Sequence, residues 1–532
     1  EYRSMKKIFV LHPYLLALFP ILFLFAQNVR SMKPEALIVP GIVALVVTFL
    51  ITLLLNLYFR NMAKSGVIAS VMIVAFFSYG YLLDLSRKMG VEFAQYEILP
   101  NLILSCVLIA AVIAAAGLIR RSDSEHSRLT RYLNLIAGLM VALQIVHAGY
   151  LLAAVEDTGP TVAEMARGKN ISTYRPNIYY IIVDGYARQD ILKEVFDYDN
   201  SAFLDHLRAR GFYVADSSHS NYARTLQSLG SSLNGDLLSR LREFGTKVGE
   251  RVSLATFVQQ SMVLMALQVF DYNIVSFVSG YDLTTMKMAD VLLTPRFTLT
   301  EFQSLIVSRT PLPFVFNHLV GPHEAHRRRV LYTLDKLANI DEVDPPYIVL
   351  AHIISPHPPF VFEKDGTPAR DSLPFSFSDG SHYFEKGGNA EDYIRGYRNQ
   401  VQFVTERLQT TIDNILLREA DNPPVIIVQG DHGSGRYLNW KSEELTWHRE
   451  RFSILNAYYL PRIDNPPLYP TITPVNTFRI IFNSYFGLDF KPCPDRSFFS
   501  TWNFPYLFSD ITDRLNDPKP PATSHTEEST DQ

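Results

Sequence analysis

The first third of the chain consists of long apolar runs separated by short polar segments. Five runs, at about 11–27, 36–58, 65–84, 98–119 and 132–154, each approach the roughly 20 residues that a membrane-spanning helix needs. The first run is short and contains Pro20. A cleaved signal peptide is the alternative for that run, but no small-residue cleavage site follows it and four more runs come after it. The pattern predicts five transmembrane helices within residues 1–155.

Basic residues at the ends of these runs predict the orientation of the helices. A cytoplasmic N-terminus puts four basic residues outside and nine inside, and the inner nine are Arg3, Lys6, Lys7, Arg60, Lys64, Arg120, Arg121, Arg128 and Arg131. The excess of positive charge favours this orientation. Five crossings then place everything after about residue 155 outside the cytoplasm. Four crossings would place it inside, so the prediction depends on the first run.

After residue 155 the pattern changes to short apolar runs that alternate with helical periodicities. Residues 156–175 are polar and read as a linker, and the Pro-, Ser-, Thr- and Glu-rich residues 516–532 as a disordered tail. Strands are expected at 177–183, 211–215, 271–278, 346–353, 424–429 and, as an edge strand, 451–460. Helices are expected at 188–210, 226–233, 253–268, 325–339, 393–417 and 476–486. This alternation predicts an α/β domain over 176–515, with a mostly parallel sheet flanked by helices.

Charge and cysteine content add little to this picture. The chain has 49 basic and 53 acidic residues, and a net charge of -4 gives no reason to expect a nucleic acid as a partner. Cys106 lies in an apolar run and Cys493 near the end of the chain. They indicate neither a disulfide framework nor a cysteine metal site.

Candidate chemistry gathers where the buried strands end. Asp184 follows the run Asn177 to Val183, and Asp431 and His432 follow a second run of the same kind. In open α/β sheets, ligands bind at the carboxyl ends of the strands. Thr225 starts a predicted helix, either as an N-cap or where an anion such as phosphate would bind. With His357 in a proline-rich turn, this set suits Zn²⁺ or Mn²⁺ and a hydroxyl nucleophile activated by the metal.

At these residues the chain resembles the alkaline phosphatase and sulfatase superfamily. Ile182-Val-Asp-Gly185 is similar to its first metal-ligand motif, and the run from Thr225 to Gly235 to its nucleophile segment. Gly430-Asp-His-Gly433 resembles the motif that supplies two further ligands, and His357-Pro-Pro-Phe360 the His-x-Pro-aromatic turn. The resemblance covers about 175–510. Five spans before an external domain resemble the layout of lipoteichoic acid synthases, phosphoethanolamine transferases and a related envelope regulator.

Departures from the family pattern narrow what the resemblance implies. Thr225 is followed by Leu226 instead of the Pro and Arg that formylglycine formation needs, so sulfatase activity is not expected. Ile353, with His352 beside it, stands where two-metal members have a further Asp. The resemblance therefore implies one metal, held by Asp184, Thr225, Asp431 and His432, with three histidines left for substrate or protons: His357, His352 and His448.

The resulting hypothesis is an enzyme embedded in a bacterial-type inner membrane. With a divalent metal, Mn²⁺ or Zn²⁺ with Mg²⁺ as the alternative, Thr225 would take phosphoglycerol or phosphoethanolamine from a phospholipid donor. The phosphothreonine would pass it to an envelope glycan or lipid acceptor, with His357 as acid or base. Two rivals remain open at this point: a phosphoric ester hydrolase of the same superfamily, and a non-catalytic membrane sensor or lipid-binding protein.

Overall fold

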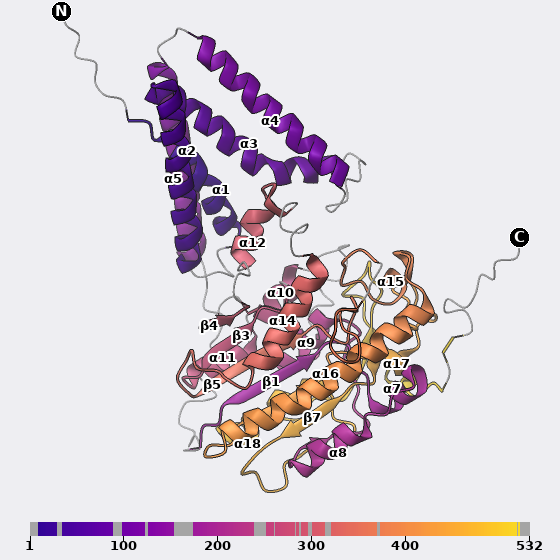
Figure 1. Ribbon diagram of the computed structural model, residues 1–532. Coiled ribbons are helices and arrows are strands. Elements are labelled where there is room, and N and C mark those ends of the chain that lie inside the picture. The colour runs from indigo at the N-terminus through magenta and orange to yellow at the C-terminus, as the bar shows by residue number, and fades with distance from the viewer. Residues whose placement is uncertain are drawn as a thin grey trace, which may run out of the picture. The chain divides into compact units, whose positions relative to one another are not determined.

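The structure is a computed structural model, and the chain in it divides into two units. One unit comprises residues 1–157 and 297–321, and the other 158–296 and 322–532 (Figure 1). Most of the expected linker and tail lies outside the described residues. The residues that the structure describes are 9–28, 34–88, 98–122, 126–153, 174–238, 252–259, 261–281, 283–286, 289–295, 301–313, 321–369, 373–518 and 520–521.

The first unit contains the five helices that the apolar runs predict. Four are long and apolar enough to cross a membrane, whereas the first has 17 residues and a length of about 25 Å. The bounds of the five are α1 (His12–Asn28), α2 (Ile38–Phe59), α3 (Met62–Lys88), α4 (Ile98–Arg121) and α5 (Ser127–Ala153).

Helix α1 lies among the longer helices and runs in the same direction as α3 and α5. Its first N–H groups, at Leu11 and His12, donate to the side chain of Asn134 near the start of α5. The His12 ring is 2.6 Å from the hydroxyl of Ser70 in α3. A Cβ at Gly66 would lie 2.2 Å from the Val10 side chain, so the two helices approach closely there. Because α1 starts where α3 and α5 start, the chain leaves the bundle at the opposite end.

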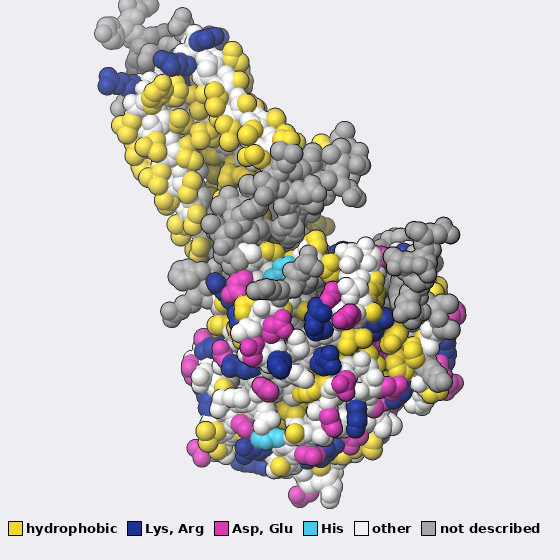
Figure 2. Space-filling model, turned by 45° about the vertical axis from the view of Figure 1, so that its right-hand side comes forward, with side chains coloured by type: hydrophobic (Ala, Val, Ile, Leu, Met, Phe, Trp, Pro, Cys, Tyr) yellow, Lys and Arg dark blue, Asp and Glu magenta, His cyan; other side chains and the backbone are white. Residues whose placement is uncertain are grey.

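The surface of this unit is apolar along its sides and basic at one end (Figure 2). Lys64, at the start of α3, donates to the carbonyls of Arg120 and Ser122 at the end of α4. Arg120 also reaches the hydroxyl of Tyr58 at the end of α2. These basic residues lie at the end where α1 begins. This is the end that the sequence predicts to be cytoplasmic by the positive-inside rule.

The second unit is built on a seven-stranded, mostly parallel sheet, which confirms the predicted fold class (Figure 1). The strand order is β2-β7-β6-β1-β5-β3-β4, and among the described strands of this sheet only β7 pairs antiparallel, with β2 and with β6. The bounds are β1 (Ile178–Val183), β2 (Tyr213–Val214), β3 (Asn273–Phe277), β4 (Val291–Leu293), β5 (Tyr347–Ile353), β6 (Val425–Gln429) and β7 (Asn456–Tyr459).

Helices cover both faces of this sheet, and β1 at its centre is buried on both sides. Tyr179, Ile181 and Val183 belong to one apolar cluster, and the alternate residues of β1 belong to the other. The first cluster includes side chains of α7 (Gln189–Phe196), α8 (Ser201–Ala209), α14 (Pro322–Lys336) and α16 (Ala390–Arg418). The second includes side chains of α9 (Thr225–Asn234), α10 (Val252–Gln259), α11 (Met262–Val269) and α18 (Thr477–Phe486).

Several predicted elements differ from the structure in identifiable ways. The single helix expected at 188–210 is two helices, because Asp197 adopts a left-handed conformation with φ of 50°. The helix expected at 253–268 likewise divides into α10 and α11. The strand expected at 451–460 begins as the short helix α17 (His448–Phe452), and β7 lies inside the sheet with β2 at its edge. Strand β4 was not predicted.

The turn after β1 offers a test of how the fold fixes Asp184. The Tyr397 hydroxyl donates to the Gly185 carbonyl at 2.7 Å and accepts from the Ala187 N–H at 3.1 Å. Replacing Tyr397 with Phe leaves both buried groups unpaired, so we expect a loss of about 1–3 kcal/mol in the free energy of unfolding. The fall in the melting temperature of the purified protein in detergent measures this loss.

The control is Tyr332→Phe, because the Tyr332 hydroxyl has no hydrogen bond among the described residues. Equal melting temperatures for the two variants would contradict the role of Tyr397.

Candidate metal centre and active site

Asp184 stands at the carboxyl end of β1, where the chain turns into Gly185. The φ of Gly185 is 74°, a conformation that glycine adopts without strain. One carboxylate oxygen of Asp184, Oδ2, is 3.0 Å from Nε2 of His352 on the neighbouring strand β5. The other oxygen, Oδ1, is buried and has no hydrogen-bond partner among the described residues. The side chain is thus held by one oxygen and presents the other.

Asp431 repeats this arrangement after β6, which pairs with β1 in parallel. Its Oδ1 accepts hydrogen bonds from the backbone N–H groups of Gly185 and His432, at 3.1 and 3.0 Å. Its Oδ2 is buried without a hydrogen-bond partner in the described part of the chain. The hydrogen bond from Gly185 ties the two strand ends together and fixes the distance between the two carboxylates.

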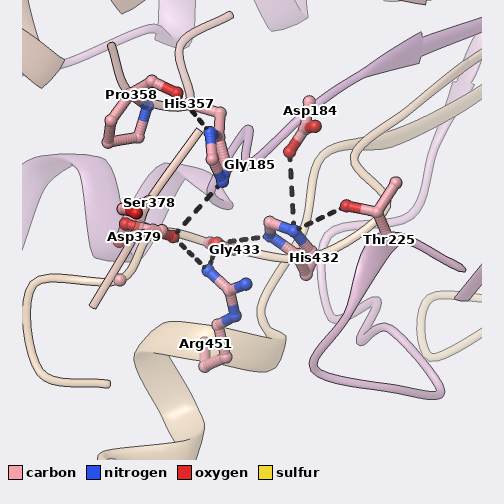
Figure 3. A network of polar contacts seen from close by, with 12 residues as sticks. Asp184, Gly185, Thr225, His357, Pro358, Ser378, Asp379, His432, Gly433 and Arg451 are labelled. Atoms are coloured by element: carbon pink, nitrogen blue, oxygen red, sulfur yellow. Dashed lines mark hydrogen bonds and ion pairs between the residues drawn. The ribbon is translucent and has the colours of Figure 1, made fainter. Parts of the chain in front are cut away.

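His432 lies between Asp184 and Thr225 (Figure 3). Its Nε2 is 3.5 Å from Oδ1 of Asp184, 3.4 Å from Oδ2 of Asp431 and 3.3 Å from the hydroxyl oxygen of Thr225. Its Nδ1 lies 2.9 Å from the carbonyl oxygen of Gly433, which can only accept, so Nδ1 carries the proton. Nε2 therefore turns a lone pair toward the carboxylate oxygens.

These side chains fit a divalent cation. Two partnerless carboxylate oxygens and an imidazole lone pair face one another in a buried place, and without positive charge between them they would repel. Carboxylate and imidazole are ligands that Zn²⁺ and Mn²⁺ accept. Ligand atoms of Asp184, His357 and His432 lie within 4.8 Å of one another, as do those of Asp184, His352 and Asp431. A buried Asp/His cluster at the predicted edge of the sheet is thus a candidate metal site.

The electrostatics of the cluster favour protonation states that suit a metal. Burial alone would raise the pKa of the Asp184 carboxyl, but His357, His352 and His432 outweigh it and hold that pKa below its usual range. Burial, and then the charge of Arg451, lower the pKa of His432. Near neutral pH, Asp184 is therefore ionised and the His432 ring is neutral.

Thr225 is the first residue of α9, and the sequence left its role open between an N-cap and an anion site. Arg224 takes the N-cap position, so the N-cap interpretation of Thr225 is wrong. The helix ends at Gly235, which has a φ of 56°. The Thr225 hydroxyl is thus presented at the positive end of the helix dipole, where the phosphoryl group of a substrate would be stabilised.

His357 faces the same space from the loop after β5. Its N–H donates to the carbonyl of Asp184, and its own carbonyl accepts from the Gln400 side chain. The Nδ1 atom is 2.6 Å from the Pro358 carbonyl oxygen, which can only accept, so Nδ1 carries a proton. The other ring nitrogen, Nε2, is then the atom that can exchange a proton with a substrate. Nε2 is 3.8 Å from a carboxylate oxygen of Asp379. The resulting geometry suits a group that takes up and releases a proton.

Asp379 and Arg451 are site residues that the sequence did not reveal. Arg451 is 1% exposed and pairs with Asp379 at 2.6 Å (Figure 3). The Tyr393 hydroxyl also donates to Asp379. Burial would raise the pKa of Asp379, but Arg451 and the nearby histidines hold it below its usual range. A Cβ at Gly435 would lie 2.5 Å from both Asp379 carboxylate oxygens, so the loop after Asp431 and His432 can pass this pair only as glycine.

These groups, apart from Asp431, line one cavity of about 280 Å³. The guanidinium of Arg224 lies 5.0 Å from the ring centre of Trp440 and 4.8 Å from that of Trp502. Two arginines and two tryptophans thus stand beside the nucleophile candidate. The lining residues that carry charge or polarity are Asp184, Arg224, Thr225, His357, Ser376, Ser378, Asp379, His382, His432 and Arg451.

Two of the predicted histidines do not line this cavity. His352 lies behind Asp184 and is held by the Thr284 hydroxyl, 2.7 Å from its Nδ1. His448 starts α17 and packs against the rings of Phe452 and Phe499. Neither of its ring nitrogens has a hydrogen-bond partner among the described residues. A role for these two in binding substrate stays a prediction.

Comparisons with known proteins give structural neighbours only. No family model and no curated protein sequence matches the chain. Solved structures that match include the Zn complex of the C-terminal periplasmic domain of EptC from Escherichia coli, at 13% identity and a TM-score of 0.42, covering 66% of this chain and 96% of that one. Another is the integral membrane protein lipooligosaccharide phosphoethanolamine transferase A (EptA) from Neisseria meningitidis. Its identity to this chain is 12% and its TM-score 0.39, and the match covers 89% of this chain and 95% of that one. A third is BT1596, a 2-O GAG sulfatase, with an identity of 11% and a TM-score of 0.38. This match covers 66% of this chain and 76% of that one.

Identities of 11–13% and TM-scores of 0.38–0.42 leave the function to be argued from the residues of this chain.

Asp431→Asn tests the candidate metal site. The amide keeps the size of the side chain but removes the charge that faces His432, so we expect metal affinity to fall at least about tenfold. Elemental analysis after dialysis against buffered Zn²⁺ or Mn²⁺ measures the bound metal. His448→Gln, outside the cavity, is the control and should bind metal as the unchanged protein does. Equal metal content in both variants would exclude Asp431 as a ligand.

His448 provides a separate test of the structure through pH. Burial, then the charge of Arg514, lower its pKa to about 4, whereas the unfolded chain takes up this proton near 6.5. Between these values the unfolded state binds the proton and the folded state does not, so acid lowers the free energy of unfolding. The loss amounts to at most about 3 kcal/mol. Melting temperatures at pH 7.5 and 5 should differ less in His448→Gln than in the unchanged protein; an equal drop in both would contradict the burial of a neutral His448.

Proposed function

We propose that this protein is a metal-dependent transferase that moves a phospholipid-derived phospho-head group, phosphoglycerol or phosphoethanolamine, onto an envelope glycan or lipid. The observation that carries the proposal is the Thr225 hydroxyl, 3.3 Å from Nε2 of His432 and beside the two buried carboxylates. A helix start, a cation site and two arginines around one hydroxyl suit attack on a phosphodiester. Helices able to span a membrane on the same chain suit a lipid donor.

A divalent cation, held by Asp184, Asp431, His432 and Thr225, would supply Lewis acidity that lowers the pKa of the threonine hydroxyl. In the first half-reaction, Thr225 Oγ1 loses its proton to solvent water and forms a bond to phosphorus, and the bond between phosphorus and the diacylglycerol oxygen breaks. His357 Nε2, 3.8 Å from Asp379, gives a proton to that leaving oxygen. Arg451 and Arg224 line the cavity and would balance the charge of the phosphoryl oxygens.

The second half-reaction reverses these roles. An acceptor hydroxyl loses its proton to His357 Nε2 and attacks the phosphothreonine, and the Thr225 oxygen leaves and takes a proton from solvent water. Trp440 and Trp502 lie at the cavity with their ring centres 5.5 Å apart and their planes tilted by 60°, and they would support the apolar face of a sugar ring of the acceptor. Water in place of the acceptor would make the same site a hydrolase.

The orientation of the first unit supports an external site for this chemistry. Five spanning helices with basic residues at the end where α1 begins would put the chain after α5 outside the cytoplasm. The proposed setting is the outer face of a bacterial-type inner membrane, with Zn²⁺ or Mn²⁺ as the metal and Mg²⁺ as the alternative.

Thr225→Ala tests the nucleophile. Removing the hydroxyl removes the bond that stores the phospho-head group, so we expect transfer from a phospholipid to fall at least about a thousandfold. Thr225→Ser keeps a hydroxyl at the same place and should keep measurable turnover. Mass spectrometry of the protein after incubation with lipid should find a head-group phosphate on Thr225 in the unchanged protein and none in Thr225→Ala.

Product analysis separates the proposal from its rivals. Head-group phosphate on a supplied glycan acceptor supports the transferase, whereas free phosphate ester in equal yield with and without acceptor would favour a hydrolase. Full activity of Thr225→Ala would overturn the mechanism. Metal binding without any adduct or product would favour a sensor.

A further inference from the structure

A segment within the sequence of the second unit packs with the transmembrane helices. Residues 297–321 follow β4 and precede α14, yet they belong to the first unit. They include α12 (Glu301–Ser308), and Phe302 and Ile306 of this helix share a buried apolar cluster with Phe25 of α1. The rings of Phe25 and Phe302 meet edge to face at 6.2 Å. This segment is thus a sixth helical component of the transmembrane unit.

Direct backbone contact holds the segment against α3. The Gly80 N–H donates to the Arg309 carbonyl at 3.0 Å. A Cβ at Gly80 would lie 2.5 Å from the Ser308 carbonyl oxygen, so only glycine permits this approach. The Arg309 guanidinium lies 4.9 Å from the ring centre of Tyr81. Such a contact fixes the position of α12 on the bundle.

Between this segment and the bundle lies an apolar cavity of about 550 Å³. Ile21, Ile73 and Ile306 are buried at its wall, whereas Val43 and Val47 of α2 are about half exposed, so the cavity is open to the side of the bundle. The lining is apolar apart from Thr48, Gln303 and Thr310.

The cavity extends from the middle of the bundle toward the end away from the basic residues. Its α2 residues run from Val39, near the start of that helix, to Ile51, and its α3 residues, Met72 to Phe77, lie near the middle of that helix. Because α2 starts and α3 ends opposite the basic residues, the positive-inside rule puts the cavity between the middle of the bilayer and the outer leaflet. Its open side then faces lipid tails of that leaflet.

We propose that this cavity binds one acyl chain of the phospholipid donor, an identification that rests on the proposed function for the choice of lipid. The walls are almost wholly apolar and the opening faces the bilayer, so the occupant must be apolar and must enter sideways from the membrane. A volume of about 550 Å³ lies within the usual range for small-molecule sites. The same inserted segment that joins β4 to α14 of the catalytic unit supplies one wall.

A matched pair of substitutions on α2 tests the site. Val46 and Val47 are adjacent and similarly exposed, at 51% and 48%, but only Val47 lines the cavity. Val47→Trp fills it, and Val46→Trp adds the same bulk elsewhere. The probe is a diacyl phospholipid with a photoreactive diazirine in one acyl chain, in vesicles containing the full chain with Thr225→Ala, which cannot consume the lipid.

Peptide mass spectrometry then locates the cross-links. We expect them to concentrate on Gln303 to Leu312 and on the first half of α2, to fall at least fivefold in Val47→Trp and to persist in Val46→Trp. Cross-links spread evenly around the bundle, or equal in the two variants, would overturn the proposal. In proteins with Thr225 intact, Val47→Trp should raise the KM for a long-chain donor at least fivefold and leave that for a short-chain donor unchanged.

The outcomes separate this proposal from the proposed function. The expected cross-link pattern without any transfer activity supports an acyl-chain site and contradicts the transferase. Transfer activity with evenly spread cross-links supports the transferase and overturns the acyl-chain site.

Discussion

The site depends on two carboxylates whose second oxygens have no hydrogen-bond partner in the part of the chain that the structure describes. Asp184 and Asp431 each fix one oxygen with a hydrogen bond, from His352 in one case and from backbone N–H groups in the other, and each leaves its other oxygen facing His432. Burying ionised oxygens in this way costs several kcal/mol unless a cation compensates them. The tautomer of His432, the position of Thr225 at the start of α9 and the glycines of the adjacent turns all serve this arrangement.

The sequence predicted the parts of the site that local patterns encode. Six apolar residues in β1 and five mostly apolar residues in β6 identify buried strands, and parallel neighbours bring their carboxyl ends to the same edge. Asp184 and Asp431 were therefore predictable from the residues. That Thr225 meets His432 came from a family resemblance, because 207 residues separate them and no local periodicity relates them.

Asp379 and Arg451 were missed for a related reason. Asp379 stands in a loop without apolar alternation, and Arg451 lies in a segment whose apolar residues resemble a strand although it begins as the helix α17. Their pairing across 72 residues is a tertiary contact. The inserted segment 297–321 escaped prediction too, because an eight-residue helix with a few apolar positions looks the same whether its partner is a sheet or a transmembrane helix.

The aromatic pair at the cavity has a consequence for how the molecule can be observed. The chain contains three tryptophans, and two of them, Trp440 and Trp502, flank Arg224 at the cavity that holds Thr225. The third, Trp447, packs against Tyr437. Indole emission depends strongly on nearby charge and solvent, so the native protein carries its own optical reporter of whatever occupies this cavity, without any label.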